Sequence, residues 1–369
     1  MTAPAFIDGP RAVQLVMGNQ ELLSSLAEIR ELRRRCGQED DLTTDPEYFI
    51  AANTLANRKC AAVLIRRDRE LEACVLFYEH TRFGLGLGLF RGGDYIGESL
   101  VAGPAYLRVH YVHLATQELL KRWRIHGVSL TMKASVEACA QVMGPANHFR
   151  RFHGTTVQHK LHLESTYEGM LAGMGPRTRR SLAGKRQQLE KSTNAKFIPV
   201  LEPDQALEVM LGLEAKAMPR RVSQFFHARH RLLRANQEFF SMGLQLPDGH
   251  WLSILSGWRF HGVTYVDLQM NDMHYKKESI SAVMRAFMLE HEIGRRQQII
   301  NFVAGSSLLL RRYCAPIEPC TDIFIAKPGL LTSFFEMAAK HTREGSVYER
   351  VKSETDTPAD AQLPTEIES

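Results

Sequence analysis

The sequence predicts an α/β (α+β) chain built from two similar halves, each a mixed, mainly antiparallel twisted sheet flanked by helices. Three observations lead to this class. The chain has 369 residues, which exceeds one ordinary domain and suits two. Hydrophobic residues make up 44% and charged residues 24%, a balance typical of globular domains and not of fibrous or wholly disordered chains. The same order of expected elements, three strands followed by helix, strand, helix and strand, occurs in both halves.

The first half begins with a helical pattern, and three strand-like runs follow it. A Gly103-Pro104 step then interrupts the pattern before helices and strands alternate. The elements expected are a helix over 21–35, strands over 60–65, 71–78 and 83–90, a helix over 106–123, a strand over 128–132, a helix over 135–143 and a strand over 155–163.

The second half contains a meander whose turns have a clear mechanism. Pro247 fixes φ and Gly249 tolerates positive φ, and a second tight turn is expected at Gly262. The next helix has an apolar stripe at i, i+3, i+4, i+7 and i+8, formed by Ile280, Val283, Met284, Phe287 and Met288. The elements expected are helices over 178–191, 204–217 and 232–242, strands over 196–200, 243–246, 251–260 and 263–270, a helix over 279–294, a strand over 299–303, a helix over 306–313 and a strand over 321–325.

These patterns predict an N-terminal domain over 1–165, a C-terminal domain over 166–345 and an acidic tail over 346–369. Residues 353–369 contain five acidic residues and no Lys or Arg, and we expect them to be disordered because they are polar and hold two prolines. The whole chain has a net charge of +5, so the remainder is strongly basic. Such a surplus favours anionic ligands, such as nucleotides, CoA, nucleic acid or lipid head groups.

Several classes of protein are disfavoured. No uncharged apolar stretch is long enough to span a membrane, and the N-terminus lacks the apolar core of a signal peptide, so we expect a cytoplasmic protein. The six cysteines are scattered and form no Cys-x-x-Cys pair. We find no His, Cys and carboxylate cluster with metal-ligand spacing, so no metal is expected.

Three local features accompany the element order of the second half. They are a basic helix over 177–190, a polar segment over 275–281 that leads into a helix, and a strand–Gly–helix unit over 301–313. With them, about residues 50–330 resemble tandem GNAT-fold acyltransferases, similar to the CelD-like acetyltransferases of cellulose and polysaccharide biosynthesis and to the Fem peptidyltransferases. The resemblance implies that the fourth strand splays from the fifth and that acyl-CoA lies in the gap.

Acyl transfer from a thioester to an amine requires phosphate-binding N–H groups, a base for the ammonium proton and a proton donor for the thiolate. The resemblance implies a cofactor site at the start of the helix over 279–294, formed by Lys276, Lys277, Ser279, Ile280 and Ser281. Asp267, within an apolar strand, is the candidate base, and Tyr313 is the candidate acid. The alternatives are that Ser279 is only an N-cap, Asp267 faces solvent and Tyr313 is a packed aromatic.

Basic residues are candidates for binding the acceptor. Arg177 and Arg180 lie on the basic helix and Arg221 in a later Arg- and His-rich segment. Each stretch is alternatively a solvated surface, and nucleic-acid binding is the least favoured interpretation because no aromatic interleaving accompanies the charges. The first half has Val101–Tyr106 at the phosphate-loop position, with Pro104 removing one N–H donor, so we expect it to be degenerate.

The sequence thus predicts a GNAT-type N-acyltransferase that uses acetyl-CoA or another acyl-CoA as co-substrate. The expected acceptor is an amine of a small molecule or polysaccharide precursor, and a hydroxyl is the less favoured alternative. One alternative is a Fem-like aminoacyl transferase that uses aminoacyl-tRNA, the one nucleic acid we consider. The other is a non-catalytic binding protein with a decayed GNAT fold, favoured by Glu278-Ser279-Ile280 in place of a glycine-rich loop. The sequence does not give the acyl chain length or the oligomeric state.

Overall fold

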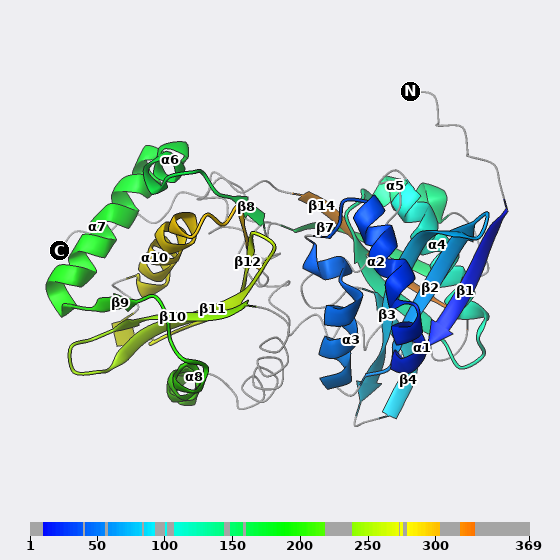
Figure 1. The fold of residues 1–369 in the computed structure, drawn as a ribbon, viewed down its shortest axis with the longest axis horizontal. Coiled ribbons are helices and arrows are strands. Elements are labelled where there is room, and N and C mark those ends of the chain that lie inside the picture. The colour runs from blue at the N-terminus through cyan, green and yellow to red at the C-terminus, as the bar shows by residue number, and fades with distance from the viewer. Residues whose placement is uncertain are drawn as a thin grey trace.

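The computed structural model describes most of the chain between residues 10 and 328. The described residues are 10–39, 41–55, 58–82, 85–92, 100–101, 107–143, 148–157, 160–217, 238–272, 274–275, 279–302 and 318–328. They form two sheets that lie side by side along the long axis of the molecule (Figure 1). The expected helix over 306–313 and the acidic tail over 346–369 lie outside these residues.

Sheet A has the strand order β1-β2-β3-β4-β6-β14-β7, with β5 paired to β3. Its pairs are antiparallel apart from β4 and β6, which run parallel. The strands are β1 Arg11–Met17, β2 Cys60–Arg67, β3 Glu70–Arg82, β4 Leu85–Gly92, β5 Leu100–Val101, β6 Gly127–Met132, β7 Phe149–Val157 and β14 Glu318–Ala326.

Sheet B has the order β8-β13-β12-β11-β10-β9, and here too a single pair, β12 with β13, is parallel among the described strands. Each half therefore contains a meander followed by a crossover helix and a parallel strand, which confirms the predicted fold class. The strands are β8 Lys160–His162, β9 Lys196–Ile198, β10 Glu238–Gln245, β11 Trp251–Phe260, β12 Val263–Asn271 and β13 Ile299–Phe302.

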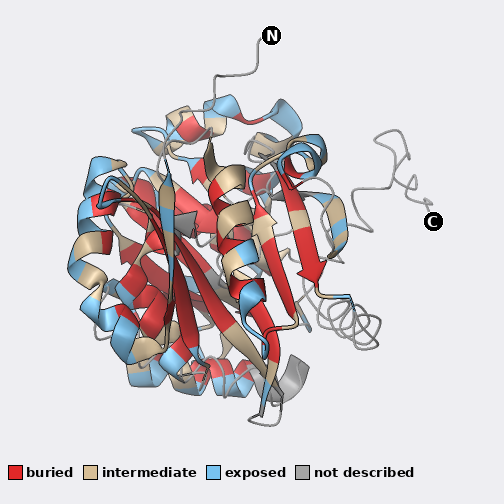
Figure 2. Cartoon of the chain, turned by 90° about the vertical axis from the view of Figure 1, so that its right-hand side faces the viewer, coloured by how far each residue is buried: buried red, intermediate tan, exposed pale blue. Residues whose placement is uncertain are grey.

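Helices cover both faces of each sheet. On sheet A, α4 and α5 pack on one face and α1, α2 and α3 on the other; on sheet B, α6, α7 and α10 cover one face and α8 the other (Figure 1). The strands between them are mostly buried (Figure 2). The helices are α1 Asn19–Ser24, α2 Leu26–Arg35, the 3-10 turn η1 Leu42–Thr44, α3 Pro46–Leu55, α4 Arg108–Lys121, α5 Val136–Val142, α6 Tyr167–Gly173, α7 Pro176–Thr193, α8 Pro203–Ala217 and α10 Ile280–Gly294. None of the described helices is long and apolar enough to cross a membrane.

The two sheets exchange strands across the boundary predicted at residue 165. The last strand, β14, was expected in the second half but lies in sheet A between β6 and β7. Conversely, the strand expected over 155–163 is two strands, β7 in sheet A and β8 beside β13 in sheet B. Ile323 and Ile325 of β14 are buried in the core of sheet A, which is the physical reason for its placement. The domain boundaries themselves stay a prediction.

Other expected elements differ locally. Residues 238–242, predicted as the end of a helix, are the start of β10, because a long hairpin pairs Glu238 with Arg259 and pairing overrides local propensity. The helix expected over 21–35 is divided into α1 and α2 at Ser25. Strand β1 and helix α3 were not predicted. The two turns of the meander are confirmed, with φ of 89° at Gly249 and 80° at Gly262.

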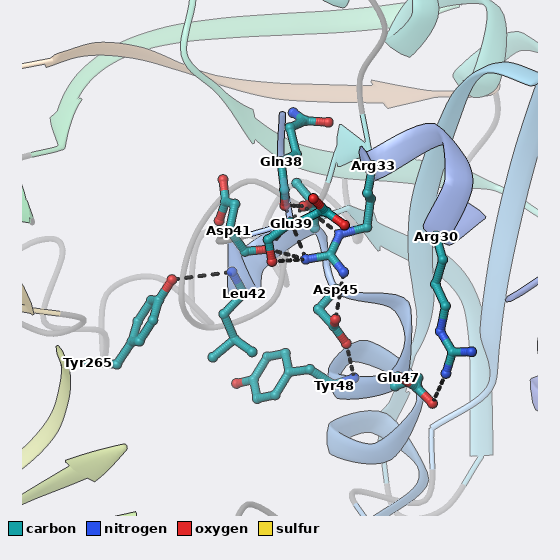
Figure 3. A network of polar contacts seen from close by, with 11 residues as sticks. Arg30, Arg33, Gln38, Glu39, Asp41, Leu42, Asp45, Glu47, Tyr48 and Tyr265 are labelled. Carbon is teal, nitrogen blue, oxygen red and sulfur yellow. Dashed lines mark hydrogen bonds and ion pairs between the residues drawn. The ribbon is translucent and has the colours of Figure 1, made fainter. Parts of the chain in front are cut away.

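A contact between the halves forms where the segment around η1 meets sheet B (Figure 3). The backbone N–H of Leu42 donates to the Tyr265 hydroxyl over 3.2 Å, and Tyr48 packs with Trp258 in the same apolar cluster. Arg33 holds this segment, because its guanidinium donates to Asp45 over 2.7 Å and to three backbone carbonyls (Figure 3). The orientation of β12 is thereby fixed from the first half of the chain.

The apolar stripe of α10 is buried as predicted: Ile280, Val283, Met284, Phe287 and Met288 all lie in the core on that face of sheet B. Phe287 lies near its edge, 8% exposed. Its ring stacks on Phe197 with centroids 4.8 Å apart, and the Arg186 guanidinium lies 4.0 Å from its centroid.

We expect Phe287→Ala to lower the free energy of unfolding by about 3 kcal/mol, through lost burial and a residual cavity. Urea titration measures this change. Leu211→Ala on α8 is the matched control, because Leu211 is 42% exposed and its truncation should cost much less. A loss below about 1 kcal/mol at Phe287 would mean that its ring contacts are not those of the folded protein.

Candidate functional site

The site centres on the point where β12 and β13 stop pairing. Their parallel register runs from Val263 opposite Ile299 to Val266 opposite Phe302. Beyond Val266, β12 continues to Asn271 and remains paired with β11 alone among the described residues. The last strand of the meander, β12, thus extends beyond its pairing with β13.

Asp267 lies at a β-bulge at this point. Ser256 of β11 pairs with Leu268 and its neighbour Gly257 pairs with Val266, so Asp267 is the extra residue. The bulge shifts the alternation of β12 by one residue. Val266 before it and Gln269 after it both face α10, so Tyr265 and Leu268 share the opposite face, Tyr265 toward the first half of the chain and Leu268 in the cluster around α8. A bulge re-aims the backbone locally, which is how sheets present main-chain N–H groups and side chains at a site.

The start of α10 provides donors near this point. Ser279 has left-handed backbone geometry, with φ of 54°, and its carbonyl accepts from the N–H groups of Ala282 and Val283. The N–H groups of Ile280 and Ser281 precede these and have no acceptor within the helix. The Lys185 ammonium of α7 donates to the Ser279 hydroxyl. A positive helix terminus and an ammonium thus converge, an arrangement that suits an anion.

Gln269 ties β12 to this helix start. Its Nε2 donates to the Ser281 carbonyl over 3.1 Å, and its Oε1 accepts from Arg285 Nε over 2.8 Å. These two hydrogen bonds, both to α10, fix its first turns relative to the free part of β12.

A buried carboxylate holds the segment between β12 and α10. Asp272 accepts from His250 Nε2 over 2.8 Å, and from the backbone N–H and Nδ1 of His274 over 3.0 and 2.8 Å. Because a carboxylate can only accept, it favours the tautomers in which His250 carries a proton on Nε2 and His274 on Nδ1. No group of described His, Cys, Asp and Glu side chains, this one included, is arranged to hold a metal ion.

Asn301 lies on β13 beside the end of the pairing. It is 3% exposed, and its Oδ1 has no hydrogen-bond partner within the described part of the chain. Ile300 and Phe302 pack in the core under α10, so Asn301 faces the opposite side, next to Tyr265. A buried amide oxygen without a donor is costly, and it offers an acceptor to the N–H of a ligand.

The predicted site residues are brought together only in part. Ser279, Ile280 and Ser281 lie at the α10 start, and Ile280 has its side chain buried, so its contribution would come from its backbone N–H. Asp267 lies on β12 at the bulge. Arg177 and Arg180 are exposed on α7. Three cofactor or acid candidates and one acceptor candidate lie outside the described residues: Lys276, Lys277, Tyr313 and Arg221.

The first half has an equivalent junction. Strands β4 and β6 pair in parallel from Leu89 opposite Gly127 to Arg91 opposite Ser129. Residues 102–106, expected at the phosphate-loop position, lie outside the described part. Which half carries the site, and whether the first half is degenerate, remain predictions.

Sequence reasoning missed Lys185, Gln269, Arg285, Asp272 and Asn301. The sequence carried a weak signal for two of them, because Gln269 and Asn301 are polar residues inside otherwise apolar strand patterns. Lys185 lay within the basic helix but could not be distinguished from its neighbours without the packing of α7 on α10.

Comparison with known proteins adds fold-level support. No family model matches the chain, and no curated protein sequence matches it. Among solved structures, FemX is similar over 82% of this chain and 95% of its own, with a TM-score of 0.55 and 9% identity. A tandem GNAT protein from the clavulanic acid biosynthesis pathway covers 86% of this chain and 99% of its own, with a TM-score of 0.52 and 9% identity. L-PGS from Bacillus licheniformis covers 87% and 97%, with a TM-score of 0.52 and 9% identity.

These similarities and the strand order define the chain as a tandem GNAT-like fold, as the resemblance in the sequence implied. At this level of identity, they describe the fold and not the reaction.

Proposed function

We propose that the chain is an N-acyltransferase that moves an acyl group from acyl-CoA to an amine. The observation that carries the proposal is the junction itself: parallel pairing of β12 and β13 ends at Val266, a bulge follows at Asp267, and the start of α10 adjoins the extended strand. An extended thioester substrate would add alongside the free part of β12 and present its phosphates to the helix.

The residues present fit this co-substrate. The N–H groups of Ile280 and Ser281, with the Lys185 ammonium beside Ser279, would hold its phosphates. When bound, acyl-CoA supplies an activated acyl thioester. The unpaired Oδ1 of Asn301 would accept a hydrogen bond from the amine, which favours an amine over an acceptor without N–H groups.

Transfer forms a bond between the amine nitrogen and the carbonyl carbon and breaks the carbon–sulfur bond. We assign Asp267 to take the proton released from the ammonium, because it occupies the bulge beside the junction. Tyr313 is our candidate to give a proton to the departing thiolate, and this assignment rests on the resemblance alone.

We expect Ser281→Asp to weaken acetyl-CoA binding at least tenfold, or about 1.4 kcal/mol, because it places a negative charge where the phosphates would lie. The fold should tolerate the change, since Asp is favourable in the first turn of a helix. Isothermal titration calorimetry measures the affinity, and a thermal melt checks the fold.

Ser135→Asp is the matched control. Ser135 caps α5 in the first half, and its hydroxyl accepts from the N–H of Ala138, a role that Asp also fills. This variant should bind acetyl-CoA like the parent. If Ser281→Asp binds acetyl-CoA as tightly as the parent does, the phosphates do not bind at the start of α10. Absence of binding by the parent at millimolar acetyl-CoA would overturn the donor, and dependence of activity on charged tRNA would then identify the Fem-like alternative.

A further inference from the structure

Basic and aromatic side chains gather at one end of sheet A, away from the junction described above. They come from the α4–β6 connection, the start of β7 and the residues after β14. Ala326 pairs with both Gly127 and Phe149, so these three segments lie side by side. Lys327 joins them, because its Nζ donates to the Arg122 carbonyl over 2.5 Å. We call this surface the basic end; it comprises Arg122, Trp123, Arg124, His148, Phe149, Arg150, Arg151 and Lys327.

Trp123 dominates the basic end. Its side chain is 76% exposed, the largest fraction among the exposed large hydrophobic residues of the described chain. The Arg124 guanidinium lies 4.5 Å from its ring centroid, and Arg122 and Arg124 are both exposed. Phe149, 36% exposed, lies on the neighbouring strand β7. An exposed indole beside two arginines, with Phe149 on β7, suits a partner that is apolar and anionic.

Arg150 adds a further positive charge to the basic end. Its Nε and Nη1 atoms are buried and have no hydrogen-bond partner in the part of the chain that the structure describes. Burial lowers the pKa of its guanidinium, and no described carboxylate counteracts this. Burial also lowers the pKa of His148, with the charges of Arg150 and Lys327 adding to the effect. Within the described residues, the positive charge of Arg150 is thus not compensated by a carboxylate.

We propose that the basic end of sheet A docks on an anionic lipid bilayer. Indole rings favour the interface between head groups and acyl chains, because the apolar ring contacts the acyl chains while its N–H remains hydrated. Arginines and lysines around it would contact lipid phosphates, and clusters of this size suffice for attraction to an anionic leaflet. The docking would be peripheral, through one loop and two strand ends.

Nucleic acid fits the same surface less well. Proteins that bind single strands offer several aromatic faces on which successive bases stack. Here one indole face is covered by Arg124, and Phe149 packs edge-on against Phe324 with centroids 6.2 Å apart. The positive charge suits either polymer or bilayer, but a single exposed indole flanked by arginines suits the bilayer better.

Flotation of the full chain with vesicles tests the proposal without reference to acyl transfer. Vesicles of phosphatidylcholine with about one-third phosphatidylglycerol are compared with phosphatidylcholine alone, at about 0.1 M salt. We expect at least tenfold stronger binding to the anionic vesicles. Trp123→Ala should weaken it severalfold, and Arg122→Glu/Arg124→Glu should abolish it. Lys191→Glu/Lys196→Glu, the same charge change on exposed lysines of the second half, should bind like the parent.

Tryptophan fluorescence gives a second readout. The chain has three tryptophans, and Trp258 is 1% exposed. Anionic vesicles should shift the emission to the blue in the parent and not in Trp123→Phe. The proposal is overturned if the parent does not bind, if it binds both vesicles equally, or if both basic-end variants bind as the parent does. It is also overturned if single-stranded RNA binds with the same sensitivity to these variants while vesicles do not.

Discussion

Gly257→Ala should lower the free energy of unfolding by about 3 kcal/mol or more. A Cβ atom at this position would lie 1.8 Å from the carbonyl oxygen of Tyr265 and 3.1 Å from the ring of Phe240. The clash involves the backbone of β12, which cannot move away. Tyr265 is paired with Asn301 on its other side, and its hydroxyl accepts from Leu42 of the first half.

Urea titration of parent and variant measures this effect. Gly184→Ala on α7 is the matched control, because nothing lies within 4 Å of the added Cβ. That variant should be more stable than the parent by about 0.5–1 kcal/mol, since Ala favours helix over Gly. If the free energy of unfolding of Gly257→Ala lies within about 1 kcal/mol of that of the parent, strands β11 and β12 do not approach as closely at the bulge as the structure indicates.

The same bulge explains why the candidate site was only partly predictable. A strand over 263–270 without a bulge would place Tyr265 and Gln269 on one face. Because Asp267 is an extra residue, Gln269 instead faces α10 and bonds to Ser281. A bulge depends on which residues of the partner strand lie opposite, and sequence periodicity within one strand does not contain that information.

Local signals predicted the two turns of the meander and α10 well. Pro247 and Gly249 specify a turn that most other residues would strain, and the stripe of α10 has one apolar face. The exchange of β8 and β14 was not predictable in this way. Strand β14 is buried on both faces, and β8 is only three residues long with one buried side chain, so neither pattern indicates which sheet the strand joins.

The basic residues illustrate the same limit at the level of function. Arg177 and Arg180 are candidates for binding the acceptor because the helix is basic, and both are exposed. The contact with the start of α10 comes instead from Lys185 on the same helix. Charge composition indicated an anionic ligand. The contact that supports one depends on how α7 packs against α10.

Arg259→Met should destabilise the second half by about 3–5 kcal/mol, because it leaves a buried charge without its partner. Arg259 of β11 donates to both oxygens of Glu292, over 2.9 and 2.6 Å, and Glu292 is 0% exposed. The remaining partner of that carboxylate would be the Thr264 hydroxyl, at 2.6 Å. The ion pair also ties α10 to the sheet, and so contributes to the position of the helix start at the candidate site.

Two further variants distinguish this burial effect from loss of a surface charge. Arg295→Met removes an exposed arginine that contacts Glu238, as Arg259 does, and should cost less than about 1 kcal/mol. Arg259→Met/Glu292→Met removes both buried charges and should recover most of the stability lost in the single variant, because two well-packed apolar side chains replace the pair. Urea titration of the four proteins provides the comparison. If the double variant is less stable than Arg259→Met, Glu292 stabilises the fold through contacts other than its ion pair with Arg259.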